Sequence, residues 1–320
     1  MSAYLLAEDA QHFVRSPEWT WYIWVYFFFA GLSGGSYALA SLHRLRGGPG
    51  TAGVARLGYY TAFATLLVCP VMLILDLGRP LRFWHMMWNT TPDGAGLNFK
   101  YWSPMSVGVW ALLVYGAFAT LSFGEALARD GRLRLPLSGQ VLRLLDGVAG
   151  RIVAVVGLVF GLFIAGYTGV LLSVSNQPVW SDTWALGGLF LASGLAGSAA
   201  LLHFLTRYRA DAGPGAPALV VTERLYALLE LALVVVFALT LLPAGTADEV
   251  FGYPWLLLWL VALAGMLPGL SGLAGTRLAV TGEGVTVPVQ PAAAARTAAV
   301  TAAVLLGVLA LRAAVIFTVQ

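Results

Sequence analysis

The sequence predicts an all-α integral membrane protein with eight transmembrane helices, and two observations support this fold class. First, 59% of its 320 residues are hydrophobic and only 10% are charged, whereas a soluble domain carries about 25% charge. Second, eight apolar runs have the length of about 20 residues that a helix needs to cross a bilayer, and their composition favours packed helices. The predicted spans are 19–42, 54–76, 103–126, 148–173, 184–206, 218–242, 253–275 and 293–317.

The basic residues predict how these spans are oriented. The segments that follow the first, third, fifth and seventh spans carry 13 of the 18 Lys and Arg residues. Because cytoplasmic loops carry an excess of Lys and Arg, we expect both termini on the non-cytoplasmic side of a prokaryotic inner (cytoplasmic) membrane. Residues 1–18 are expected to form an interfacial segment, followed by one eight-span domain, 19–320, arranged as two four-helix bundles. With a net charge of only +3, we expect membrane lipid and no nucleic acid as a partner.

The first two spans contain the first candidate site. Span one has a run of small residues, Gly31–Gly35, which indicates close packing against other helices. Span two ends in the polar and aromatic segment Asp76–His85. Charged groups are costly at the membrane, so such a cluster usually performs chemistry or holds a partner. The alternative is that Arg79, Arg82 and Trp84 only anchor the helix end among the lipid headgroups.

The later spans complete the predicted site. Span four ends in the segment from Tyr167 to Trp180, which is rich in aromatic and polar residues. Consecutive spans alternate in direction, so this segment, the end of span two and the start of span one must share one membrane face. The sequence therefore predicts an aromatic, partly polar site near the outer surface, within residues 19–180.

Two further features leave other functions open. Glu230 lies near the middle of span six, where an ionisable residue indicates a proton relay or a neutral acid that is hydrogen-bonded to a neighbouring helix. One alternative function is therefore a proton- or ion-translocating protein, although we see no repeats or broken helices typical of transporters. His43 and His203 both lie at cytoplasmic span ends, so a haem-b quinol oxidoreductase subunit is the other alternative.

The chain resembles the NrfD/PsrC family, the membrane subunits of polysulfide-reductase-type respiratory complexes. Three motifs support the resemblance. They are Asp76–Phe83 with Asn98 and Ser103–Trp110, then Gly166–Ser173 with Pro178–Trp180, and the Gly31–Gly35 run.

The resemblance implies a membrane anchor that binds quinone or quinol, expected to be menaquinone, near the outer face. It also implies a ferredoxin-like iron–sulfur subunit over that face and a molybdopterin-dependent catalytic subunit beyond it. Electrons would pass to or from the iron–sulfur partner, with proton transfer as a possible addition, and this chain either oxidises quinol or serves only as the anchor. No haem or iron–sulfur cluster is expected in this chain, and its single cysteine provides no cluster or metal site.

The resemblance also suggests roles for individual residues. Tyr167 occupies the family position of the tyrosine that contacts the quinone ring, with Thr168 beside it. Span one lacks the Asn or His of some relatives, so Trp24 or Tyr26 would supply the second ring contact. The remaining candidates are Asp76, His85 and Glu230 for proton transfer, and Arg79, Arg82, Trp84 and Trp180 for structure or partner contact.

Overall fold

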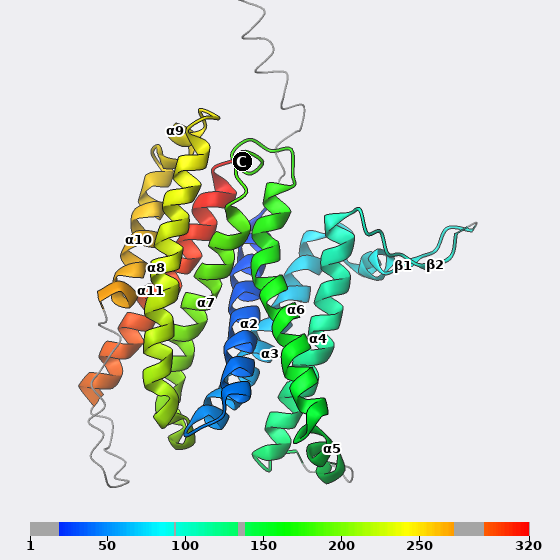
Figure 1. Cartoon of the computed structure of the whole chain (residues 1–320). Coiled ribbons are helices and arrows are strands. Elements are labelled where there is room, and N and C mark those ends of the chain that lie inside the picture. Colours follow the sequence, from blue (N-terminus) through cyan, green and yellow to red (C-terminus); the bar gives the residue numbers. More distant parts are fainter. Residues whose placement is uncertain (1–18, 93, 134–137, 272–290, 320) are drawn as a thin grey trace, which may run out of the picture.

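The computed structural model describes residues 19–92, 94–133, 138–271 and 291–319, which are mostly helical (Figure 1). The long helices are α2 (Trp21–Arg46), α3 (Thr51–Asp76), α4 (Pro104–Arg129), α6 (Val148–Ser173), α7 (Leu186–Leu205), α8 (Ala216–Leu241), α10 (Trp255–Ser271) and α11 (Pro291–Phe317). The short elements are η1 (Pro80–Met86), β1 (Trp88–Asn89), β2 (Gly96–Leu97), α5 (Ser138–Leu145), η2 (Thr206–Tyr208), η3 (Ala210–Gly215) and α9 (Ala247–Phe251). The two strands pair antiparallel, with Trp88 opposite Leu97.

Seven of these helices are long and apolar enough to cross a membrane. The predicted all-helical membrane class is therefore confirmed. The predicted span 253–275 corresponds to α10, which the structure describes over the 17 residues that end at Ser271, so the count of eight spans stays a prediction. The predicted interfacial segment, 1–18, lies outside the described residues.

Helices α2 and α7 form the centre of the molecule. In the most apolar stretch of each span, 78% of the residues are buried in α2 and 72% in α7, against 28% in α4 and in α8. Helix α2 packs against α3, α6, α7 and α11, whereas α8 packs mainly against α7 and α10. The division into two four-helix bundles stays a prediction.

The glycines of α2 explain how its backbone can lie so close to its neighbours. A Cβ atom on Gly35 would lie 2.8 Å from the carbonyl oxygen of Gly194 on α7. A Cβ atom on Gly34 would overlap the carbonyl oxygen of Gly161 on α6. The close packing that the Gly31–Gly35 run predicted is therefore confirmed, since only glycine leaves room for the crossing helices at these positions.

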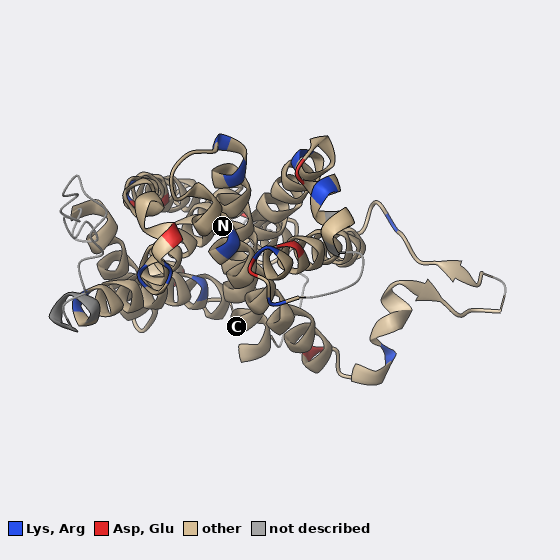
Figure 2. Cartoon of the chain, turned by 90° about the horizontal axis from the view of Figure 1, so that it is seen from below, with Lys and Arg blue, Asp and Glu red and all other residues tan. Residues whose placement is uncertain are grey.

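The two ends of the helix assembly differ in charge. One end, which we call the arginine-rich end, consists of residues 47–50, 130–133, 138–147 and 206–215 with the helix ends that adjoin them, and it lies at the bottom of Figure 1. Figure 2 views the chain from this side and shows Lys and Arg positions on several neighbouring helices. The opposite end carries η1, residues 174–185, α9 and the end of α11. The start of α2, the end of α3 and the end of α6 share this opposite end, as the alternation of spans predicted.

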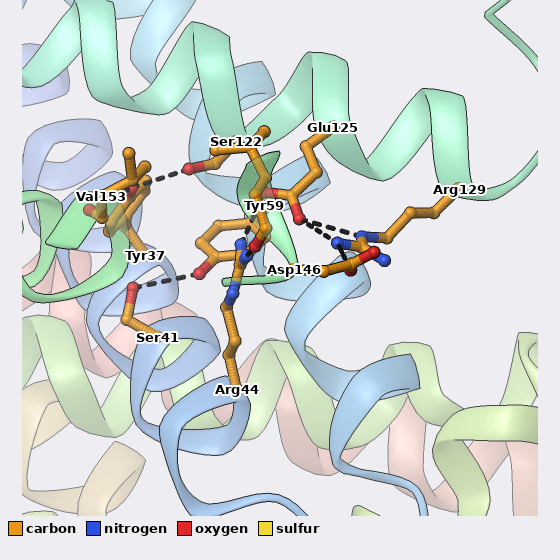
Figure 3. Close-up of polar contacts among 10 residues, drawn as sticks. Tyr37, Ser41, Arg44, Tyr59, Ser122, Glu125, Arg129, Asp146 and Val153 are labelled. Atoms are coloured by element: carbon orange, nitrogen blue, oxygen red, sulfur yellow. Dashed lines mark hydrogen bonds and ion pairs between the residues drawn. The ribbon is translucent and has the colours of Figure 1, made fainter. Parts of the chain in front are cut away.

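Ion pairs join the helices at the arginine-rich end (Figure 3). Arg44 of α2 lies 2.6 Å from Glu125 of α4, and Arg129 lies 2.7 Å from both Glu125 and Asp146. Each acid in this network faces at least one guanidinium group, so burial of the charges is compensated. The network connects α2, α4 and the segment between α5 and α6.

Candidate functional site

A hollow of about 370 Å³ lies at the opposite end of the molecule from the arginine-rich end, between the end of α3, η1 and the start of α4. Its lining is rich in nitrogen donors, namely Arg79, Arg82, His85 and Lys100. The rest of its lining consists of Leu77, Met86, Asn98, Ser103, Met105 and Ser106. No carboxylate is among these lining residues, so the hollow presents positive charge and hydrogen-bond donors beside a few apolar side chains.

Local sequence explains the turns that build the hollow. Gly78 has a φ of 63°, a left-handed conformation that favours glycine and turns the chain sharply after α3. Ser103 caps α4 by accepting a hydrogen bond from the Ser106 backbone amide at 3.4 Å, and Pro104 takes the first helical position, where its missing amide hydrogen costs nothing. These signals set where α3 ends and α4 begins.

Asn98 joins the loop to both helical segments around the hollow. Its side-chain Nδ2 donates to the His85 carbonyl oxygen at 3.0 Å. Its own carbonyl oxygen accepts a hydrogen bond from the Trp110 indole nitrogen at 3.1 Å. Asn98 therefore positions η1 against α4, a role that its place in the motif did not reveal.

His85 lines the hollow and Asp76 directly precedes the lining residue Leu77, and neither has a charged partner among the described residues. The His85 ring lies 4.0 Å from the Trp84 ring, and its Nδ1 is 3.3 Å from the Thr90 hydroxyl oxygen. Asp76 is the last residue of α3 and is half-buried. Within the described residues no ion pair joins Asp76 to Arg79, although Arg79 follows it by only three residues. Both residues are placed where they could accept a proton.

Tyr167 lies directly behind the start of α4. Its hydroxyl donates to the Pro104 carbonyl oxygen at 2.5 Å, and its ring stacks on Phe163 at 5.4 Å. Gly108 leaves the space that the tyrosine fills, since a Cβ atom there would lie 2.6 Å from Cε1 of the ring. Pro104 lies between two lining residues of the hollow, Ser103 and Met105. The backbone at Pro104 therefore lies between Tyr167 and the hollow.

The structure separates the two aromatic candidates of span one. Tyr26 is buried on the side of α2 that faces α3 and α6, within electrostatic range of Cys69 and Tyr167. Trp24 faces α11 instead, where its indole nitrogen donates to the Leu309 carbonyl oxygen at 2.8 Å. The structure therefore brings Tyr26, and not Trp24, towards Tyr167.

Thr168 and Trp180, two further candidates near this end, are part of the helix packing. Thr168 is fully buried, and its hydroxyl donates to the Ala165 carbonyl oxygen of its own helix at 3.5 Å. Trp180 is also fully buried; its indole nitrogen donates to the Val315 carbonyl oxygen at 2.7 Å and its ring stacks on Trp19. Trp180 thus packs against α11 at this end of the assembly. Arg82 and Trp84, by contrast, are exposed on η1.

Glu230 lies away from the hollow, on α8, and is buried. Ser193 and the buried Arg312 both lie close to its carboxyl group. Glu223, on the same helix, is buried as well. The sequence analysis missed both Glu223 and the role of Arg312. Glu223 could have been found, because an acid seven residues before Glu230 lies on the same face of a helix.

The histidine pair that suggested haem lies at the arginine-rich end, on α2 and α7, which pack against each other. His43 Nδ1 lies 2.9 Å from the Leu39 carbonyl oxygen. Because a carbonyl oxygen can only accept a hydrogen bond, Nδ1 is the donor. His203 is buried. In the part of the protein that the structure describes, no group of three or more His, Cys, Asp or Glu side chains could hold a metal ion.

A family model matches almost the whole chain, and several known proteins match parts of it. The family model for polysulphide reductase, NrfD, matches residues 10–320. A polysulfide reductase chain of Wolinella succinogenes is 29% identical over 187 residues, 56% of this chain and 55% of that protein. Protein NrfD of Escherichia coli is 27% identical over 216 residues, 64% of each chain. A selenate reductase subunit of Mesobacillus selenatarsenatis is 26% identical over 203 residues, 58% of this chain and 47% of that protein. The matched part spans about half to two thirds of the length of these relatives.

Proposed function

The chain belongs to the polysulphide reductase NrfD family, and from this premise we propose that it binds quinone or quinol at the hollow beside α4 and exchanges electrons with an iron–sulfur partner. It is a multi-pass integral membrane protein, and seven helices among the described residues are long and apolar enough to span a bilayer. The observation that carries the proposal is the hollow itself, which four donor side chains line next to the start of α4 and Tyr167.

The lining chemistry supports a quinone head group. A quinone offers two carbonyl oxygens, and Arg79, Arg82 and Lys100 provide donors for them. Their positive charge would favour electron-rich, reduced forms of the ring. Val71 and Leu75 on the last turns of α3 are about half exposed, at 50% and 46%, so an apolar tail would reach the hollow from the bilayer.

A bound quinol would release two electrons and two protons on oxidation. His85 and Asp76 are the residues that we propose to accept protons, since His85 lines the hollow, Asp76 directly precedes the lining residue Leu77, and neither is held in an ion pair among the described residues. The Tyr167 hydroxyl holds the Pro104 carbonyl and so positions the first turn of α4. Tyr26 approaches the same tyrosine from α2.

The surface around the hollow suits a docked partner. Leu81, Leu97, Tyr101 and Trp102 are 67–90% exposed on η1, β2 and the segment before α4. Exposed apolar groups gathered in one loop region mark an interaction surface. We propose that a ferredoxin-like iron–sulfur subunit lies over them, with a molybdopterin-dependent catalytic subunit beyond, at the outer face of a prokaryotic inner membrane. Menaquinone is the proposed quinone.

A fluorescence-quench titration with a quinol analogue tests the quinone site. Tyr167→Phe removes the hydrogen bond to Pro104 and is expected to weaken binding by about tenfold, which corresponds to about 1.4 kcal/mol. Tyr253→Phe is the matched control, because that tyrosine is 86% exposed before α10 and its hydroxyl is far from the hollow in sequence and structure. Equal affinity of Tyr167→Phe and wild type would contradict the role of Tyr167. A folded complex with its partner subunits that binds no analogue would refute the quinone site.

The haem alternative has one observation in its favour. His43 Nε2 is buried and has no hydrogen-bond partner among the described residues, so it is a nitrogen that could bind a metal. A dithionite-minus-oxidised absorption spectrum of the purified subunit decides between the two functions. We expect no haem-b band, and such a band that is lost in His43→Ala would replace the haem-free proposal.

A further inference from the structure

A second cavity lies inside the membrane, away from the quinone site. It is lined by α7, α8, α10 and α11 and offers about 10 Å³ to the centre of a water molecule, which is room for about one water. Small residues leave this space open, among them Ala227, Gly265 and Gly307. Glu223 and Glu230 contribute the carboxyl groups of its lining.

Glu223 has no visible reason to be buried where it is. The residue is 1% exposed, and neither carboxyl oxygen has a hydrogen-bond partner in the described residues. An ionised carboxylate is costly to bury without a partner, so the neutral acid is favoured in this position. A water molecule in the cavity would supply the missing hydrogen bonds. Glu223 therefore presents a transferable proton to a space with room for a water molecule.

The spacing of the two acids suits transfer between them. Seven residues separate Glu223 from Glu230, so the two lie on the same face of α8, about 10 Å apart along the helix axis. The one water that the cavity has room for would lie between the two carboxyl groups. Gly269 of α10 lets that helix lie close to α8, because a Cβ atom there would lie 2.9 Å from Ala227 Cβ and 3.6 Å from Glu223 Cγ.

Glu230 is connected onward to the opposite end. The Ser193 hydroxyl lies close to the Glu230 carboxyl group and accepts a hydrogen bond from Arg312 Nη1 at 2.9 Å. Arg312 is fully buried and donates from Nε to the Phe27 carbonyl oxygen at 3.1 Å. Its positive charge compensates Glu230 whenever that acid ionises. The residue before Phe27 is Tyr26, which approaches Tyr167.

We propose that Glu223 and Glu230 form a proton path from the arginine-rich end to the Ser193–Arg312 pair. Glu223 lies in the second turn of α8, near the arginine-rich end, and takes its proton from that side. In a forward step Glu223 gives a proton to a water in the cavity, that water gives one to the Glu230 carboxylate, and Glu223 is reprotonated from the aqueous phase. The same transfers in reverse return the proton and restore the Glu230 carboxylate. One proton moves and no electron is needed. That this path serves quinone chemistry rests on the proposed function; the path itself does not.

Infrared difference spectroscopy of the full chain during transfer from H₂O to D₂O tests the path directly. Wild type is expected to show carbonyl bands of protonated carboxylic acids that Glu223→Gln and Glu230→Gln each reduce. Glu223→Gln is also expected to slow deuteration of the Glu230 band by about tenfold or more, and Glu223→Asp to restore it. Glu249→Gln is the matched control, because that glutamate is exposed on α9 at the opposite end.

Unchanged deuteration of Glu230 in Glu223→Gln would overturn the proposal, as would the absence of any band that depends on Glu223. Gly269→Ala is a second test that keeps both acids but narrows the space beside Glu223, and it is expected to slow the same exchange. Binding of the quinol analogue by each variant is measured in parallel and is expected to be unchanged. A wild type that binds no analogue would refute the quinone site alone, while the exchange rates would still decide the proton path.

Discussion

Replacing Asp130 by Asn is expected to loosen the arginine-rich end of the molecule. Asp130 follows the last residue of α4 and accepts hydrogen bonds from Arg209 at 2.5 and 2.6 Å and from Tyr60 at 2.7 Å. Arg56 of α3 lies 3.1 Å away. One carboxylate therefore connects α3, α4 and the segment between η2 and η3. Asn keeps the size of the side chain but removes the charge that these donors face.

The pKa of Asp130 gives the magnitude. Hydrogen bonds from Arg209 lower the pKa of this carboxyl group from 3.8 to about 2. Each pKa unit corresponds to about 1.36 kcal/mol, so the charged form contributes about 2 kcal/mol to stability. Because the folded pKa is below the unfolded value of about 3.9, this contribution is fully present above about pH 4 and is lost as the pH falls towards about 2.

Denaturant unfolding of the detergent-solubilised protein, followed by tryptophan fluorescence at pH 7 and at pH 3, measures this effect. Asp130→Asn is expected to lose about 2 kcal/mol at pH 7 and to show a smaller further loss at pH 3 than wild type. Asp146→Asn is the control, since its side chain is 58% exposed and pairs with Arg129, and it is expected to lose under about 1 kcal/mol. An Asp130→Asn variant as stable as wild type at pH 7, or with the same loss at pH 3, would refute the reasoning.

Two further predictions concern the candidate site and the buried charges. Gly108→Ala is expected to displace the Tyr167 ring, to cost about 1–3 kcal/mol and to weaken binding of the quinol analogue. Gly116→Ala on the same helix, where the nearest atom would be 3.9 Å away, should leave binding unchanged; equal binding by both variants would contradict this placement of Tyr167. Arg312→Leu is expected to cost about 3–5 kcal/mol, because it leaves Glu230 without a compensating charge. Unfolding of the double variant with Glu230→Gln should show a coupling of about 1–3 kcal/mol, and strict additivity would show that the two charges do not interact.

Much of the architecture could be predicted from hydropathy and charge alone. The length and apolarity of the runs identify the spans because a bilayer imposes both. The alternation of spans correctly brought the start of α2 and the ends of α3 and α6 to one end. The small residues Gly31–Gly35 correctly indicated close helix crossings. The short elements η1, α5 and the β1–β2 pair were not predicted, since they carry too few residues for a periodic pattern.

Which way each side chain faces was decided only by the tertiary structure. A span that is apolar on all sides has no periodic pattern that reveals its rotation, so Trp24 and Tyr26 were equal candidates until α11 was seen to bind one and α3 and α6 to surround the other. For the same reason the sequence placed Asp76 at the membrane surface but did not show whether it forms an ion pair.

The buried polar groups show the same division. The sequence by itself determined that Glu230 and Arg312 lie within membrane spans, because hydropathy locates the spans. Only the tertiary structure placed Ser193 between them and left Glu223 facing a cavity. These contacts join α7, α8 and α11, whose residues are far apart in the sequence. The order of residues does not encode such contacts locally; they arise when the helices pack and their small residues determine how closely they approach.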